Sequence, residues 1–104
     1  MYEYLNIAEG SIIRYANFKD LLNKNKKSRV ILMSTKAKKS LYNFNFQNSD
    51  IILLGRESKG VPEHIHKELK NILKIPISFN TRSLNVTVAA SISAAEALRQ
   101  TKKL

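Results

Sequence analysis

The hydrophobic positions of this chain form short continuous runs that alternate with polar stretches. Residues 29–35 (RVILMST) and residues 50–55 (DIILLG) are two such runs, and each has the length of a strand. Strands that are apolar on both faces are typical of a parallel sheet covered by helices. We therefore predict that these two runs form the buried centre of a parallel sheet.

Helical spacing and prolines indicate the elements around these two runs. Phe18 and Leu21 repeat at helical spacing behind Asn17, which can cap the helix. Pro62 suits the first turn of a helix, whereas Pro76 restricts its strand to an edge or an end of the sheet. The expected elements, in chain order, are a strand at 11–16, a helix at 17–25, strands at 29–35 and 50–55, a helix at 62–72, a strand at 73–78 and a helix at 84–103. This order predicts an α/β domain.

The last of these helices has two features of its own. Leu84, Val88, Ile92 and Ala95 fall along one apolar stripe, which predicts an amphipathic helix. The alanines and serines between residues 89 and 95 form a surface of small side chains that would let another helix approach closely. Packing within the chain explains the same surface.

Length and composition limit the classes of protein that fit. The 104 residues predict one domain, residues 1–104, which is small enough that a partner chain would help to stabilise it. No cysteine occurs, so disulfides and thiolate metal sites are excluded. No apolar run has the length of a membrane span, and MYEYLNIAEG at the N-terminus carries two acidic residues instead of a basic region. We expect a cytoplasmic protein without a membrane anchor.

The net charge of +10 is divided evenly, with nine basic and four acidic residues in each half of the chain. A basic surface of this kind favours polyanionic partners such as nucleic acids, because Lys and Arg displace counterions from phosphates. A composition rich in lysine and asparagine that only keeps the protein soluble is the alternative.

Two glycines interrupt the chain after the second apolar run. Gly55 follows the predicted strand and Gly60 precedes the predicted helix, as in GRESKG at 55–60. Ligand loops of open α/β sheets lie beyond the carboxyl ends of the strands, where glycine lets the backbone approach a ligand. The spacing matches neither the dinucleotide nor the phosphate-loop motif, so a loop with two positive-φ glycines also explains it.

A second polar segment precedes the last predicted helix. It ends in Arg82, Ser83 and Asn85, and the N–H groups that open such a helix can bind a carboxylate or a phosphate. Ser83 and Asn85 are also ordinary capping residues.

Taken together, LLGRESKGVP (53–62) and KIPISFNTRSLNVTVAASISAAEALRQ (74–100) closely resemble the SPOUT class of RNA methyltransferases, the α/β-knotted family. Within that class the chain is most similar to the small tRNA (cytidine/uridine-34 2′-O)-methyltransferases. The similarity extends more weakly through RVILMST, so it covers nearly the whole chain. It implies a parallel-sheet domain with a trefoil knot that binds S-adenosylmethionine, methylates a ribose 2′-hydroxyl of RNA, most naturally tRNA, and forms a homodimer.

The resemblance also implies a set of site residues. Met33 would end one strand that contacts the cofactor, two glycines would bound a second loop, and Ile75 would open a third. Glu57 and Lys59 would orient the second loop or face RNA. The implied cofactor-binding residues are Met33, Gly55, Glu57, Gly60, Ile75, Ser83, Leu84 and Asn85. The implied RNA-binding residues are Lys59 and Arg82.

One departure from the family concerns catalysis. Full-length relatives begin with a further strand and helix that carry an N-x-G-x-x-x-R type motif, whose arginine is thought to activate the hydroxyl or hold the phosphate. The chain is expected to be N-terminally truncated relative to them, so that this arginine would lie before Met1. Arg14 does not match it in context, and the catalytic residue is left unknown.

Other kinds of site find little support in the sequence. His64 and His66 are two positions apart on a predicted helix and point to different faces, so we interpret them as surface residues and predict no metal site. Two alternatives to an active enzyme are left open. One is a catalytically inactive RNA-binding remnant of the same fold, and the other is a basic structural protein associated with the ribosome.

Overall fold

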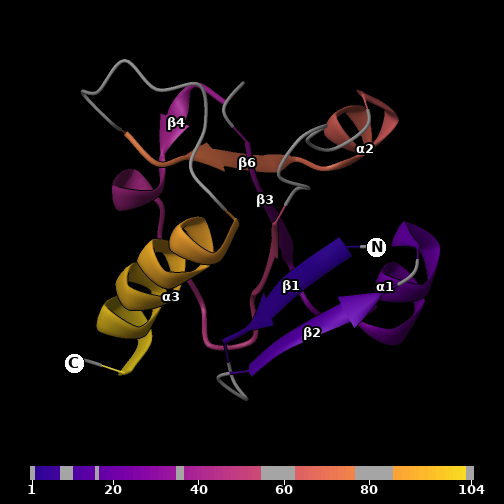
Figure 1. Ribbon diagram of the computed structural model, residues 1–104, viewed down its shortest axis with the longest axis horizontal. Coiled ribbons are helices and arrows are strands. Elements are labelled where there is room, and N and C mark those ends of the chain that lie inside the picture. The colour runs from indigo at the N-terminus through magenta and orange to yellow at the C-terminus, as the bar shows by residue number, and fades with distance from the viewer. Residues whose placement is uncertain are drawn as a thin grey trace.

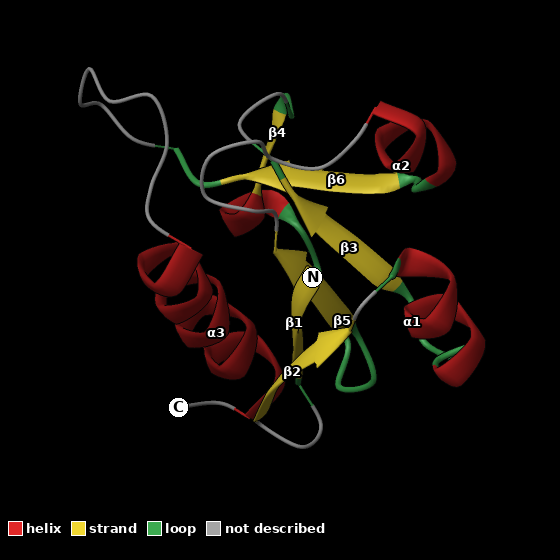
Figure 2. Cartoon of the chain, turned by 45° about the vertical axis from the view of Figure 1, so that its right-hand side comes forward, coloured by secondary structure: helices red, strands yellow, loops and turns green. Residues whose placement is uncertain are grey.

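The fold is a mixed β-sheet with helices on both faces (Figures 1 and 2). The structure is a computed structural model, and it describes residues 2–7, 11–15, 17–34, 37–54, 63–76 and 86–102. Its strands are β1 (Tyr2–Asn6), β2 (Ser11–Tyr15), β3 (Val30–Met33), β4 (Lys39–Ser40), β5 (Ile51–Leu54) and β6 (Asn71–Lys74). Its helices are α1 (Phe18–Lys24), the short 3-10 helix η1 (Leu41–Asn43), α2 (Glu63–Glu68) and α3 (Val86–Lys102).

The six strands lie in the order β2-β1-β5-β3-β6-β4. Strand β3 pairs in parallel with β5 and with β6, and β4 extends the parallel part by pairing with β6. Strand β1 is antiparallel to both β5 and β2. The prediction of an α/β domain is confirmed, but a purely parallel sheet is wrong for β1 and β2. Only residues 7–10 separate these two strands, and a connection this short can join only antiparallel neighbours.

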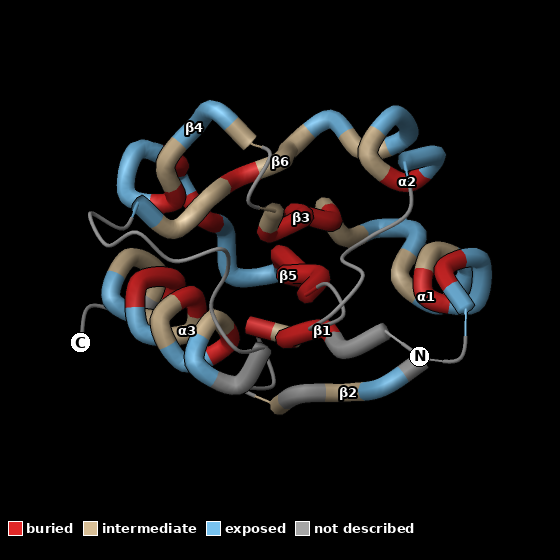
Figure 3. Tube along the Cα trace, turned by 45° about the horizontal axis from the view of Figure 1, so that its top comes forward, coloured by how far each residue is buried: buried red, intermediate tan, exposed pale blue. Residues whose placement is uncertain are grey.

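The two central strands, β3 and β5, are buried at every position and contribute side chains to the core on both faces of the sheet. Successive side chains of a strand point to opposite faces of the sheet. Ile31, Met33, Ile52 and Leu54 therefore pack on the side of α3, together with Ala90 and Ala97. Val30, Leu32, Ile51 and Leu53 pack on the other side, together with Phe18 and Leu21 of α1 and Ile65 of α2. Figure 3 shows these strands between α3 on one side and α1 and α2 on the other.

The helix α3 presents a different face to the sheet from the one that the apolar stripe predicted. Val88 is 45% exposed and Ala95 is also exposed, whereas Ala90, Ser93 and Ala97 are buried. The face with small side chains packs on the sheet because it lets the helix backbone approach the large apolar residues of β3 and β5 closely.

The element boundaries also differ from expectation at β6. The helix expected at 62–72 ends at Glu68, and the strand expected at 73–78 already begins at Asn71. Ile72 and Leu73 pair with Leu32 and Met33 of β3, so the sheet takes residues that local helical spacing had assigned to the helix. Strands β1 and β4 were not expected at all.

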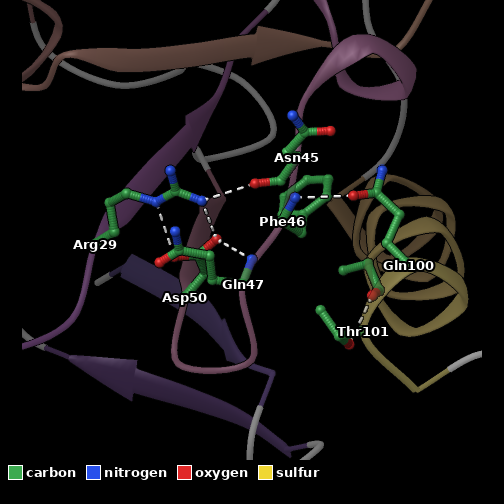
Figure 4. Close-up of polar contacts among 8 residues, drawn as sticks. Arg29, Asn45, Phe46, Gln47, Asp50, Gln100 and Thr101 are labelled. Carbon is green, nitrogen blue, oxygen red and sulfur yellow. Dashed lines mark hydrogen bonds and ion pairs between the residues drawn. The ribbon is translucent and has the colours of Figure 1, made fainter.

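An ion pair joins the amino ends of β3 and β5 (Figure 4). Arg29 donates to both carboxylate oxygens of Asp50, from Nε at 2.9 Å and from Nη2 at 2.6 Å. The wholly buried Asp50 carboxylate also accepts from the backbone N–H of Gln47 at 2.7 Å. The hydrogen bonds from Arg29 to Asp50 and the charge of that carboxylate raise the pKa of Arg29 above its usual value, against the opposing effect of burial. The pair fixes the end of the sheet that lies away from the candidate site.

Candidate functional site

The carboxyl ends of β5, β3 and β6 meet at one edge of the sheet. Met33, the last residue of β3, is in register with Leu54 of β5 and with Leu73 of β6. The next backbone N–H, that of Ser34, donates to the carbonyl of Leu73 at 2.8 Å. Ligands of open α/β sheets bind beyond the carboxyl ends of the strands, so this edge is the candidate site.

Two of the residues expected to bind a cofactor lie at this edge. Met33 is 8% exposed and belongs to the core cluster on the α3 side. Ile75 follows β6 directly, is half-buried and packs against the same cluster. Met33 and Ile75 are distant in sequence, but both lie at the ends of neighbouring strands and pack in the same apolar cluster.

The other predicted site residues lie outside the part of the chain that the structure describes. The elements next to them show where their segments start. Strand β5 ends at Leu54, directly before the 55–62 segment, and the 77–85 segment runs between Pro76 and α3. The described residues that precede these two segments thus belong to β5 and to the stretch directly after β6, at the edge defined above. The residues concerned are Gly55, Glu57, Lys59, Gly60, Arg82, Ser83, Leu84 and Asn85.

One polar contact at this edge was missed by sequence reasoning. Ser34 Oγ and His66 Nε2 share a hydrogen bond of 2.8 Å, which ties α2 to the end of β3. Both residues are half-buried, so the interpretation of His66 as a plain surface residue is wrong, although His64 is exposed. The buried Ile65 fixes how α2 sits on the sheet, and the neighbouring His66 thereby reaches Ser34. No local pattern in the sequence signals a contact between positions this far apart.

A hollow of about 490 Å³ adjoins this contact and is lined by residues of β4, β6 and α2. Figure 1 shows the arrangement of these three elements. His66 lines it from α2, so the hydrogen bond to Ser34 connects the hollow with the end of β3. Among its nine described lining residues three are lysines and none is acidic. The lining residues are Ala37, Lys38, Lys39, Phe44, His66, Lys70, Asn71, Ile72 and Leu73.

The described ranges offer neither a metal site nor a membrane span. No group of three or more His, Cys, Asp or Glu residues there is arranged to hold a metal ion. None of the helices described has the length and apolar character needed to cross a membrane.

Comparison with protein families and known proteins finds similarity to RNA methylases. Residues 4–95 match the model of the SpoU rRNA Methylase family. A tRNA (cytidine(34)-2′-O)-methyltransferase of Beijerinckia indica is 49% identical over 72 residues, which are 69% of this chain and 45% of that protein. The enzyme of the same name from Ancylobacter novellus is 39% identical over 92 residues, which are 86% of this chain and 58% of that protein. The chain thus spans about half the length of these curated relatives.

A solved structure agrees with the sequence relatives. It concerns the 2-OH methylation of C/U34 on tRNA, and it superimposes with a TM-score of 0.77 at 36% sequence identity. The superposition covers 86% of this chain and 59% of the other. The fold and the sequence therefore lead to the same group of proteins.

Proposed function

The chain belongs to the SpoU rRNA methylase family, and from this membership we propose that it binds S-adenosylmethionine and methylates a ribose 2′-hydroxyl of tRNA. The relatives that it resembles are named for 2′-O-methylation of cytidine 34 in tRNA, which makes this nucleotide the first substrate to test. The observation that carries the proposal is the register of Leu54, Met33 and Leu73. It places the ends of three parallel strands at the edge where a cofactor would bind.

The residues described at this edge fit an adenosine-containing cofactor. Such sites are mostly apolar, with a few backbone groups that fix the orientation of the ligand. Met33 and Ile75 supply apolar contacts at neighbouring strand ends. From the family resemblance we propose the rest of the cofactor site, namely Gly55, Glu57, Gly60, Ser83, Leu84 and Asn85, and we propose Lys59 and Arg82 as contacts to RNA.

The proposed reaction depends mainly on alignment. When bound, the cofactor supplies an electrophilic methyl group on a sulfonium sulfur. The chain would hold the ribose hydroxyl in line with that group and would exclude water from it, which can supply a large part of the lowering of the barrier. A proton acceptor for the hydroxyl is also required.

We extend the proposal to features that accompany this activity in the family. These are a trefoil knot formed by the C-terminal segments, one domain over residues 1–104, and a homodimer. The superposition on a solved relative over 86% of the chain supports the knotted fold. A cytoplasmic location follows from the tRNA substrate that the relatives' names give.

The proposal is tested first by calorimetric titration of the chain with S-adenosylhomocysteine. We expect saturable binding of one molecule per chain. Gly55→Val should abolish binding because a branched side chain would occupy the space where the backbone approaches the ligand. Ala95→Val, which adds similar bulk on the exposed face of α3, is the matched control and should bind normally. A folded chain that shows no saturable binding would overturn the cofactor proposal.

Methyl transfer is then tested with radiolabelled S-adenosylmethionine and a tRNA transcript carrying cytidine 34. A transcript with 2′-deoxycytidine at that position is the control, since it lacks only the acceptor hydroxyl. We expect label in the first transcript and not in the second. Cofactor binding without transfer to any RNA would instead favour an inactive RNA-binding form.

A further inference from the structure

The hollow between β4, β6 and α2 has no role in the proposed cofactor site. Lys39 borders it from β4, and Lys38 borders it from the position directly before that strand. Lys70 borders it from the turn before β6. All three lysines are exposed, and none has an acidic ion-pair partner among the described residues. Three lysines border one hollow, and the part of its lining that the structure describes contains no acidic residue, which makes a local site for an anion.

An aromatic ring orients one of these lysines. Lys39 Nζ lies 5.5 Å from the centre of the Phe44 ring, within the range of a cation–π contact. The ring itself is held by the Arg29 guanidinium at 4.7 Å and by the edge-to-face contact with Phe46 at 5.0 Å. A lysine that is oriented before binding loses less side-chain freedom when it meets an anion.

The lining favours the backbone of a nucleic acid over its bases. Binding of bases without sequence preference uses exposed aromatic rings as stacking surfaces. The described lining contains two aromatic rings. Phe44 is only 6% exposed, and the half-buried ring of His66 is hydrogen-bonded to Ser34, so neither offers an open stacking surface. Lysine ammonium groups are common partners of phosphate oxygens, and Asn71, another lining residue, carries an amide that can donate to them.

The hollow also lies beside the candidate cofactor edge. His66 lines the hollow and shares a hydrogen bond of 2.8 Å with Ser34. Ser34 directly follows Met33, and its N–H binds the carbonyl of Leu73, another residue of the lining. A strand of RNA whose phosphates occupy the hollow would therefore pass next to the ends of β3 and β6.

We propose that this hollow binds the phosphodiester backbone of the RNA substrate through Lys38, Lys39 and Lys70. The identity of the polyanion rests on the proposed function, whereas the binding surface rests on the geometry of the hollow alone. The site holds RNA next to the cofactor edge and consists of other residues than Lys59 and Arg82, the RNA contacts proposed from the family resemblance.

The test compares charge-removing variants at two ends of the molecule. Lys39→Gln combined with Lys70→Gln removes two of the three lysine charges of the hollow. Lys26→Gln combined with Lys27→Gln removes the same charge from the exposed turn after α1 and is the matched control. Lys39→Arg combined with Lys70→Arg keeps the charge of the hollow. Binding of a fluorescent oligouridine and of a tRNA transcript is measured over a series of salt concentrations, with S-adenosylhomocysteine titrated in parallel.

We expect the hollow variant to bind both RNAs about tenfold more weakly at low salt. The slope of log affinity against log salt should fall by about 0.7 for each phosphate that the variant no longer neutralises. The control variant should change much less, the arginine variant should bind nearly as the unmodified chain does, and affinity for S-adenosylhomocysteine should be unchanged in all of them.

Three results would overturn the proposal: equal losses in the hollow and control variants, no RNA binding by the unmodified chain, or displacement of the RNA by inorganic phosphate at matched ionic strength. The last result would identify a site for small anions instead of a polymer backbone. Failure of the proposed function would look different, because the unmodified chain would then not bind S-adenosylhomocysteine while the lysine effects on RNA remained.

Discussion

Ser34 Oγ lies 2.8 Å from His66 Nε2, so a single hydrogen bond joins the carboxyl end of β3 to the helix α2. This bond connects three parts of the proposed machinery. Ser34 is adjacent to Met33 at the cofactor edge, His66 lines the lysine-rich hollow, and α2 begins at the end of the 55–62 segment. The position of α2 against the sheet therefore affects both proposed binding sites.

Loss of this hydrogen bond should weaken cofactor binding modestly. Ser34→Ala and His66→Ala should each lower the affinity for S-adenosylhomocysteine by about twofold to tenfold, which corresponds to one net hydrogen bond. Calorimetry on both variants and on the double variant measures the coupling. Because both substitutions remove the same bond, the double variant should be little worse than either single one. His64→Ala, at the exposed neighbour, is the control, and strictly additive losses would contradict a shared role.

The ion pair at the opposite end of the sheet should contribute strongly to stability. Asp50→Asn leaves Arg29 without its carboxylate and should lower the free energy of unfolding by about 2 kcal/mol. The loss is smaller than for a fully buried pair because the Arg29 side chain is 34% exposed and solvent screens its charge. Urea unfolding followed by circular dichroism measures the change.

Two variants test whether the hydrogen-bond geometry of this pair matters. Arg29→Lys keeps the charge but cannot reach both carboxylate oxygens in the same way, so it should lose part of the stability. Glu68→Gln replaces an exposed carboxylate in α2, serves as the control, and should change stability by less than about 0.5 kcal/mol. An Asp50→Asn variant as stable as the original chain would show that the pair is dispensable.

The central strand β5 should tolerate little loss of volume. Leu53 is fully buried in the cluster on the side of α1 and α2, and Leu53→Ala should cost about 3 kcal/mol through lost burial and the cavity left behind. Val88→Ala on the exposed face of α3 should change stability by less than about 0.5 kcal/mol. Thermal and urea unfolding of both variants compare the two positions, and similar costs would contradict the assigned core.

Protonation of Glu96 should lower the stability of the fold at acid pH. Two hydrogen bonds from Arg99 lower the pKa of this carboxyl, and a further hydrogen bond from Gln100 acts in the same direction, against the effect of burial. A lowered pKa in the folded state means that the carboxylate stabilises the fold fully above its unfolded pKa. This contribution is lost as the pH falls through the lowered folded value.

Glu96→Gln should therefore reduce stability at neutral pH, and the difference from the unmodified chain should shrink in acid. Urea unfolding at a series of pH values from neutral to below about pH 4 measures the trend. Glu68→Gln, at an exposed position of α2, is the control and should show a much smaller difference. A difference between Glu96→Gln and the unmodified chain that stays constant with pH would contradict the role given to this carboxylate.

The sequence predicted elements that are determined by local pattern. The apolar runs around Leu32 and Leu53 were predicted as strands because they are continuous, as expected for strands that are buried on both faces. The structure shows both as strands that are buried at every position. Strand β4 was missed because its two residues become a strand only by pairing with Leu73 and Lys74, far along the chain. The start of β6 was misplaced for the same reason, since pairing with β3 overrides the local helical spacing.

The candidate site was predictable to a similar extent. Met33 and Ile75 were selected by family resemblance, and the structure places both at the carboxyl edge of the sheet. The glycine loop and the helix-capping segment stay predictions. The Ser34 and His66 contact could not be predicted, because positions 32 residues apart meet only after the sheet and α2 have packed.

The order of strands also determines when this chain can fold during synthesis. Strands β1 and β2 are neighbours in sequence and can pair as soon as they leave the ribosome, but an isolated hairpin is only marginally stable. Strand β3 has no neighbour in the sheet until β5 emerges, and its other side stays open until β6 follows. Pairing between such distant segments is slow, so the apolar faces of β3 are exposed in the nascent chain. This unfinished sheet is therefore the stage at which the growing chain most needs protection from aggregation.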